Sequence, residues 1–122
     1  MKNNYLLTDF NSTRWNNINL DIVKDEINIL NKKREGVLYG QIGNPREFDI
    51  QLSNASHLID NITLINGKVY GDVEFLDNKN GKAGYDLIEN KNYIFGIRSV
   101  GSVLADEIII DQIFTWDIIN NK

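Results

Sequence analysis

The sequence has no cysteine and a single histidine. The lack of cysteine excludes disulfide bonds and thiolate metal sites. A histidine-dependent reaction could use only His57 as its base. The nine glycines stand singly as turn residues and form no phosphate-binding loop. The acidic residues Asp106, Glu107 and Asp111 match no metal-binding motif, so we expect neither a cofactor nor a metal ion.

Long apolar runs and an excess of basic residues are also missing. No run approaches the ~20 apolar residues of a membrane span, and the first ten residues, MKNNYLLTDF, lack the apolar centre of a signal peptide. The formal net charge is −4, whereas a surface that binds a phosphate backbone needs excess positive charge. We therefore expect a soluble protein made in the cytoplasm, without a nucleic-acid or membrane partner.

The composition is that of an ordinary globular protein. Of 122 residues, 42% are hydrophobic and 25% charged, which is enough apolar material for one core. A chain of this length makes one compact domain and is too short for two. We therefore treat residues 1–122 as a single domain.

Two segments carry strong local signals. Asn66-Gly67 lies between two apolar runs and predicts a tight hairpin of strands 56–64 and 68–75, with Val69, Val73 and Phe75 on one face. Apolar residues at three- and four-residue spacing predict a helix over residues 20–33, with Asn19 as its N-cap and Gly36 at its end.

The remaining pattern is mainly of strands. It predicts an edge strand at 5–10, polar turns at 11–17 and 77–81, a strand at 37–42 and a loop with a short extended piece at 46–54. It then predicts a helix over residues 83–89, a strand at 93–99 closed by Gly101, and at 108–119 either a strand pair or one bent strand. The expected fold class is α+β: a small, mostly antiparallel β-barrel with two flanking helices.

Several motifs occur in a fixed order along the chain. They read L-Y-G-Q-I-G-N-P at 38–45, S-H-L-I at 56–59, D-N-K-N-G-K at 77–82, G-I-R-S-V-G at 96–101 and T-W-D-I-I-N-N at 115–121. This series resembles the prohead (head-maturation) protease family of tailed phages. In that family the corresponding motifs read approximately L-x-G-E-L-x-H-P, S-H-V-I, D-x-x-x-G-K, G-V-S-S-R-G and F-D-I-V-S-N-P. The resemblance covers most of the chain and implies the fold of that family.

The resemblance also locates the family's catalytic positions. The histidine of the first motif is the family's base, and the first serine of G-V-S-S-R-G is its nucleophile. Here these positions hold Asn44 and Arg98. An amide is not basic, and a guanidinium stays protonated and is no nucleophile. The resemblance thus implies a catalytically degenerate member, in which Asn44 and Arg98 lie close together.

Alternatives stay open at this site. Ser99 and His57 could form a substitute pair, although strand alternation turns Ser99 away from the face that carries Arg98. His57 is otherwise a structural strand residue. Arg98 either binds a carboxylate of a neighbouring subunit or is solvated.

The functional expectation follows from this family context. We expect a non-catalytic, multi-copy auxiliary or decoration protein of the phage capsid in the virion. Its partners would be other phage structural proteins, above all the major capsid protein, and its candidate contact residues are Trp15, Tyr39, Arg98 and Trp116. The two tryptophans are expected to be either core residues or interface anchors. The alternatives are an active maturation protease that uses Ser99 and His57, and an inactive scaffold or regulatory partner of the true protease.

Overall fold

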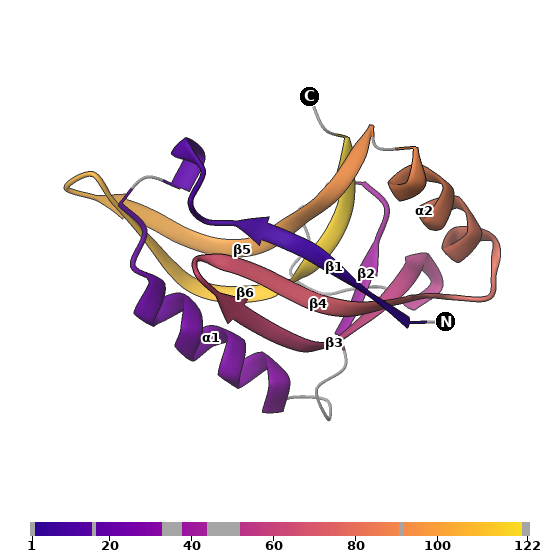
Figure 1. The fold of residues 1–122 in the computed structure, drawn as a ribbon, viewed down its shortest axis with the longest axis horizontal. Helices are drawn as coiled ribbons and strands as arrows, with labels where there is room; N and C mark the ends of the chain where they lie inside the picture. The colour runs from indigo at the N-terminus through magenta and orange to yellow at the C-terminus, as the bar shows by residue number, and fades with distance from the viewer. Residues whose placement is uncertain (1, 16, 33–37, 44–51, 91, 121–122) are drawn as a thin grey trace.

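The described strands form two antiparallel sheets (Figure 1). The computed structural model describes all residues except 1, 16, 33–37, 44–51, 91 and 121–122. The larger sheet has the order β1-β4-β3-β2 and consists of β1 (Lys2–Asp9), β2 (Leu38–Gln41), β3 (Ala55–Ile65) and β4 (Lys68–Phe75). The smaller is a long hairpin of β5 (Tyr93–Leu104) and β6 (Glu107–Asn120).

The predicted hairpin at Asn66-Gly67 is confirmed as β3–β4. Both turn residues have positive φ, 52° and 79°, as a type I′ turn requires. Gly67 is needed here for a second reason, because a Cβ at this position would lie 2.5 Å from Oδ1 of Asn11. Val69, Gly71 and Val73 face the core, in the alternation expected for β4.

In the described part of the chain, two α-helices flank the sheets. The first, α1 (Leu20–Lys32), is confirmed: Asn19 Oδ1 accepts a hydrogen bond from the amide of Asp21 at 3.0 Å, and the buried face carries Val23, Ile27 and Leu30. The second, α2 (Lys79–Glu89), begins at Lys79, so the polar turn expected at 77–81 is wrong. Asn78 caps α2 by accepting a hydrogen bond from the amide of Gly81 at 2.8 Å, which starts the helix earlier than the pattern indicated.

The mixed α+β class with antiparallel sheets is confirmed, but the closed barrel is not. At one side the sheets meet, where the amide of Gly43 donates to the carbonyl of Ile118 at 2.8 Å beside an isolated bridge between Ile42 and Ile118. At the other side β1 pairs only with β4, and β5 pairs only with β6. The described strands therefore leave one seam without ladder hydrogen bonds.

The hairpin β5–β6 is longer than expected. Gly101 does not end β5, which continues to Leu104, and residues 107–120 form one continuous strand. The register slips twice, between Arg98 and Ser99 and between Val100 and Gly101, and both extra residues belong to β6. A Cβ at Gly101 would lie 2.1 Å from the carbonyl oxygen of Ile109, so only glycine fits where β6 comes so close.

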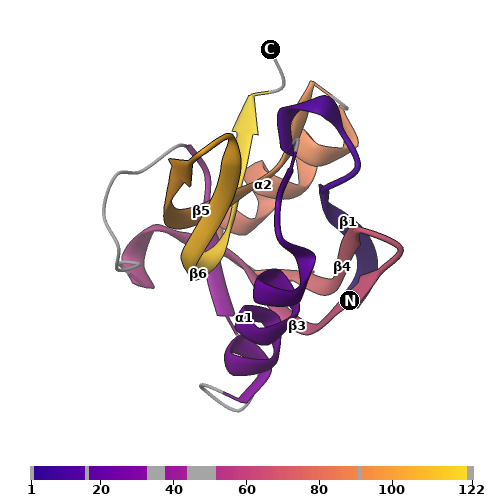
Figure 2. The same ribbon diagram turned by 90° about the vertical axis from the view of Figure 1, so that its left-hand side faces the viewer.

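The core lies between the two sheets, which face each other across the molecule in Figure 2. Trp116 on β6 is fully buried, and its indole Nε1 reaches across the core to donate to Oγ1 of Thr8 on β1 at 2.7 Å. Helix α1 contacts both β6 and β3, and α2 contacts β3. Among the described residues no helix is long and apolar enough to cross a bilayer.

Candidate functional site: a buried polar network between the sheets

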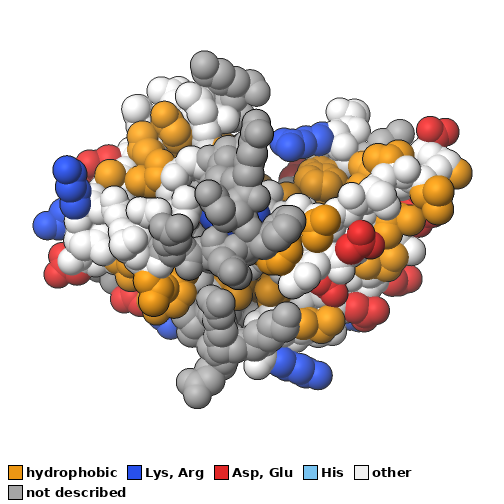
Figure 3. Space-filling view, turned by 180° about the vertical axis from the view of Figure 1, so that it is seen from behind, with side chains coloured by type: hydrophobic (Ala, Val, Ile, Leu, Met, Phe, Trp, Pro, Cys, Tyr) orange, Lys and Arg blue, Asp and Glu red, His pale blue; other side chains and the backbone are white. Residues whose placement is uncertain are grey.

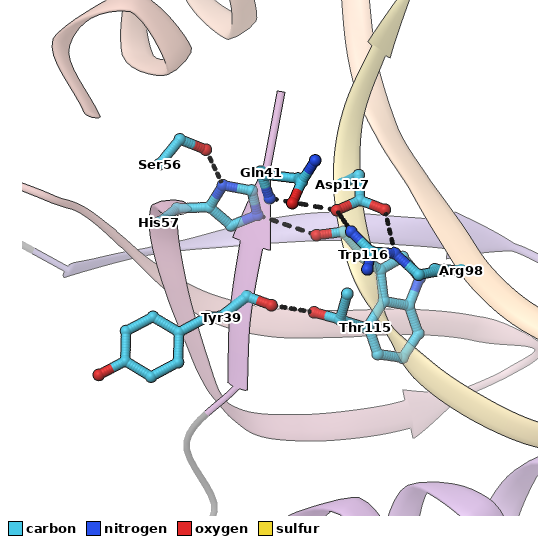
Figure 4. A network of polar contacts seen from close by, with 8 residues as sticks. All are labelled: Tyr39, Gln41, Ser56, His57, Arg98, Thr115, Trp116 and Asp117. Atoms are coloured by element: carbon cyan, nitrogen blue, oxygen red, sulfur yellow. Dashed lines mark hydrogen bonds and ion pairs between the residues drawn. The ribbon is translucent and has the colours of Figure 1, made fainter. Parts of the chain in front are cut away.

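A network of polar side chains crosses the region where β2 and β3 meet the β5–β6 hairpin (Figure 4). Among the described residues, five polar or charged side chains are buried: Ser56, His57, Arg98, Thr115 and Asp117. Each has a hydrogen-bond partner inside the chain. Buried polar groups are costly without such partners, so their interactions define what the site can do.

The central interaction is a bidentate ion pair between Arg98 on β5 and Asp117 on β6. Nε of Arg98 lies 2.8 Å from Oδ2 of Asp117, and Nη2 lies 2.6 Å from Oδ1. The amide of Gln41 on β2 donates to the same Oδ1 at 3.1 Å. The two charged side chains are only 7% and 4% exposed. A fork of parallel hydrogen bonds in such a site fixes the guanidinium in one orientation.

This ion pair corrects both expectations for Arg98. The side chain is neither solvated nor reaching toward a neighbouring subunit, because its carboxylate partner lies on the adjacent strand of the same chain. Arg98 stands opposite Thr115 in the ladder, so Asp117 is its diagonal neighbour on the same face. One signal in the sequence pointed to Asp117: it is an acidic residue within an apolar strand, and buried carboxylates need a cationic partner.

His57 lies beside this ion pair and is fully buried. Its Nε2 is 2.9 Å from the carbonyl oxygen of Trp116, and its Nδ1 is 2.6 Å from Oγ of Ser56. A carbonyl can only accept, so Nε2 carries the proton and Nδ1 accepts from the Ser56 hydroxyl. Burial lowers the pKa of His57, although the Trp116 carbonyl and the charge of Asp117 partly oppose this shift.

Glycine at position 40 makes room for the His57–Trp116 hydrogen bond. Gly40 on β2 is the cross-strand neighbour of His57. A Cβ at this position would lie 2.2 Å from Nε2 of His57 and 2.3 Å from the Trp116 carbonyl oxygen. On the same strand, the carbonyl of Tyr39 accepts a hydrogen bond from Oγ1 of Thr115 at 2.8 Å. Backbone groups of β2 thus connect the larger sheet to β6.

The substitute pair of Ser99 and His57 is not assembled in this structure. Both ring nitrogens of His57 have partners, and neither partner is Ser99. Both register slips add residues to β6, so β5 keeps its regular alternation through Arg98 and Ser99. The hydroxyl that does contact His57 belongs to Ser56, which is also fully buried. This arrangement satisfies the polar groups but leaves the hydroxyl and imidazole without access to a substrate.

The other predicted residues are dispersed. Asn44 lies outside the described residues, so its distance from Arg98 stays a prediction; Gly43, which precedes it, bonds to Ile118 next to Asp117. Trp116 is a core residue, and the expectation that it is a surface contact is wrong. Trp15 and Tyr39 are partly exposed.

Trp15 lines a hollow of about 330 Å³ between β1 and β5. Leu6, Thr8, Ile94 and Ile97 also line it, and it contains no histidine. In the described part of the chain, no group of three or more histidine, aspartate or glutamate side chains is arranged to hold a metal ion.

Comparison with known proteins gives a similarity of fold. No family model and no curated protein matches this sequence. The fold is similar to the solved structure of the bacteriophage T4 capsid assembly protease, gp21, with a TM-score of 0.78. The match covers 98% of this chain and 81% of the T4 protein at 13% sequence identity. At this identity the similarity concerns the fold alone, and it shows that this chain has the fold of that protease.

Proposed function

We propose that this protein is a non-catalytic structural component of a phage head, built on the fold of a capsid assembly protease. The observation that carries the proposal is the buried ion pair of Arg98 and Asp117. It occupies the position at which the resemblance expects the nucleophilic serine. Serine proteolysis requires a hydroxyl, a base within reach and access for the scissile bond. A guanidinium fixed in a buried fork supplies none of these.

The phage-head role rests on two supports. The ordered sequence motifs resemble the prohead protease family, and the fold is similar to the T4 capsid assembly protease. A fold can be retained as a structural module after its catalytic activity is lost, so function has to be argued from the site. Here the site is buried, internally hydrogen-bonded and without an accessible nucleophile. These features favour an auxiliary protein that works by contact with other head proteins, the major capsid protein first among them.

The first experiment tests for proteolysis. The purified protein is incubated with the head proteins of the phage that encodes it, and the products are measured by intact-mass spectrometry. We expect no cleavage. Ser99→Ala is the decisive control, because Ser99 is partly exposed and outside the buried network. Cleavage that disappears in Ser99→Ala would replace this proposal by the protease alternative.

The second experiment measures copy number in purified virions by quantitative mass spectrometry. A structural component is expected to be intact and present in many copies, comparable with other head proteins. A chain found only in immature particles and lost on maturation would contradict the structural role and favour the scaffold or regulatory alternative.

A further inference from the structure

The outer part of the β5–β6 hairpin projects from the body of the molecule. We call residues 100–112 the distal arm; it forms the left-hand extension in Figure 1. Its apolar side chains are unusually open to solvent: Val100 is 38% exposed, Val103 71% and Leu104 66%. Figure 3, which shows the opposite face, has hydrophobic side chains gathered along this projection at the right. A two-stranded ribbon with exposed apolar residues is a surface that other polypeptides cover.

The two edges of the distal arm differ. Along β6, Ile18 forms a bridge with Ile108, and Nδ2 of Asn17 donates to the carbonyl of Asp106 at 3.3 Å. Along β5, residues 99–104 pair with β6 on one side and with no other described strand on the outer side. The backbone groups on this outer side can therefore accept a further strand.

The outer edge of β5 carries none of the usual features that prevent strand pairing. Residues 99–104 read S-V-G-S-V-L, without a charge or a proline. The bulges of the hairpin lie on β6, so the β5 edge stays regular. The edge strand β1 shows the contrast, because its exposed beginning holds Lys2, Asn3 and Asn4, and Lys2 forms an ion pair with Asp60. Charged and polar residues protect that edge.

We propose that two copies of this chain associate by antiparallel pairing of their β5 edges, centred on Ser102. Antiparallel strands related by a two-fold axis present the same edge to each other, so the pairing is self-complementary. When the two-fold axis passes beside Ser102, Val100 of each copy lies opposite Leu104 of the partner subunit. Such apolar cross-strand pairs stabilise a sheet. The result is a continuous four-stranded sheet across the two copies.

Charge does not oppose this occupant at the β5 edge. The chain has a net charge of −4, so two copies repel each other on average and are expected to associate through an uncharged surface. The acidic residues of the arm, Asp106, Glu107 and Asp111, lie in the turn and on β6, whereas the β5 edge has no charge. Pairing through β5 is therefore a contact that brings no like charges opposite one another. The proposal concerns assembly and does not depend on the function proposed above.

The first test measures the molar mass of the purified protein by sedimentation velocity over a range of concentrations. An interface of this size is small, so we expect a weak, concentration-dependent dimer. Leu104→Lys places a charge on the edge and should give a monomer at every concentration. Leu52→Lys is the matched control, because Leu52 is likewise 66% exposed but lies in a short 3₁₀ helix outside the arm; it should still dimerise.

The second test uses the absence of cysteine. Ser102→Cys introduces the only thiol, and directly opposed residues of antiparallel strands have Cα atoms about 4.5–5.5 Å apart, within disulfide range. We expect rapid oxidation to a covalent dimer, visible without reductant, whereas the exposed control Ser53→Cys should cross-link slowly. A wild-type protein that is monomeric at its highest soluble concentration, or a dimer unaffected by Leu104→Lys, would overturn the proposal. A different protein partner on this edge would give the first of these results.

Discussion

The two halves of the β5–β6 hairpin place charged and apolar side chains in opposite environments. In the inner half, Arg98 and Asp117 are buried between the sheets as an ion pair. In the distal arm, Val103 and Leu104 are among the most exposed hydrophobic residues described. In most proteins the opposite is found, with charged side chains exposed to water and apolar side chains buried. The difference indicates that the inner half specifies how the chain folds, whereas the arm is available for contact with other chains.

The first prediction tests the inner half and has the largest expected effect. Arg98→Met removes the guanidinium and leaves the carboxylate of Asp117 buried without its counter-charge. Breaking a buried pair in this way costs about 3–5 kcal/mol of unfolding free energy. Chemical denaturation of the variant and the wild type measures the loss.

The double variant Arg98→Met/Asp117→Leu provides the control for this prediction. Replacing a buried pair with apolar residues of similar size is often nearly neutral, so the double variant should recover most of the lost stability. If Arg98→Met unfolds at the same denaturant concentration as the wild type, the ion pair is not what fixes the inner half.

Gly40→Ala is expected to have the next largest effect. The added Cβ would overlap the His57 ring and the Trp116 carbonyl, so the hydrogen bond between them is broken or the strands move apart. Overpacking of this kind costs about 1–3 kcal/mol. Gly43→Ala is the contrasting variant. A Cβ at Gly43 would meet no neighbouring atom, so this substitution strains only the local backbone, whose φ of 109° is rare for residues with a side chain. Gly40→Ala should therefore disturb the packing around Trp116, measured by indole fluorescence, whereas Gly43→Ala should not.

The sequence predicted those parts of the fold that depend on local signals. Asn66-Gly67 and the Asn19 cap act over a few residues, and β3–β4 and α1 are accordingly where they were expected. In α2, Gly81 was assigned to the polar turn expected at 77–81, although Gly81 and Gly84 are the small residues on the buried face of the helix. A Cβ at Gly84 would lie 3.0 Å from Cδ1 of Ile118. Tertiary packing, which helix propensity does not include, therefore explains the small residues on this face.

The site was predictable only in part. The motifs predicted that Asn44 and Arg98 stand at the catalytic positions of the family that the sequence resembles, but they did not predict the partner of Arg98. That partner depends on the register of β5 against β6, and two bulges on β6 shift this register. The burial of Trp116 was equally hidden, because an aromatic residue in a strand is as consistent with a surface contact as with a core.

The third prediction concerns the effect of pH on stability, and it tests His57 separately from the other residues of the inner half. Burial holds the pKa of His57 below its usual value, so the unfolded chain binds a proton at about pH 6.5 while the folded chain does not. The free energy of unfolding is therefore not reduced by His57 above about pH 6.5, and it decreases as the pH falls from there toward the pKa of His57 in the folded chain. Melting temperatures measured from about pH 7.5 down to about pH 5.5 should decrease.

A matched variant assigns this pH dependence. The pKa of Asp72 is also lowered, by hydrogen bonds from Asn4 and Asn61, but a carboxylate with a lowered pKa acts only in more acidic solution. Asp72→Asn should leave the decrease between about pH 7.5 and 5.5 unchanged, whereas His57→Gln should remove it. A flat profile in the wild-type protein would mean that His57 is not held neutral by burial.

The smallest effect on stability is expected in the distal arm. Val103→Thr keeps the shape and the β-branch of the side chain and only exchanges a methyl group for a hydroxyl. Because Val103 is 71% exposed, the hydroxyl stays in water, and the unfolding free energy of the monomer should change by less than about 0.5 kcal/mol. The same substitution at Val73, which is fully buried on β4, places a hydroxyl in the core and should cost about 1–3 kcal/mol. Both variants are compared by denaturation at low protein concentration, where the proposed dimer is dissociated. A large loss in Val103→Thr under these conditions would show that the arm supports the fold of its own chain, and the contrast between the two halves of the hairpin would then be wrong.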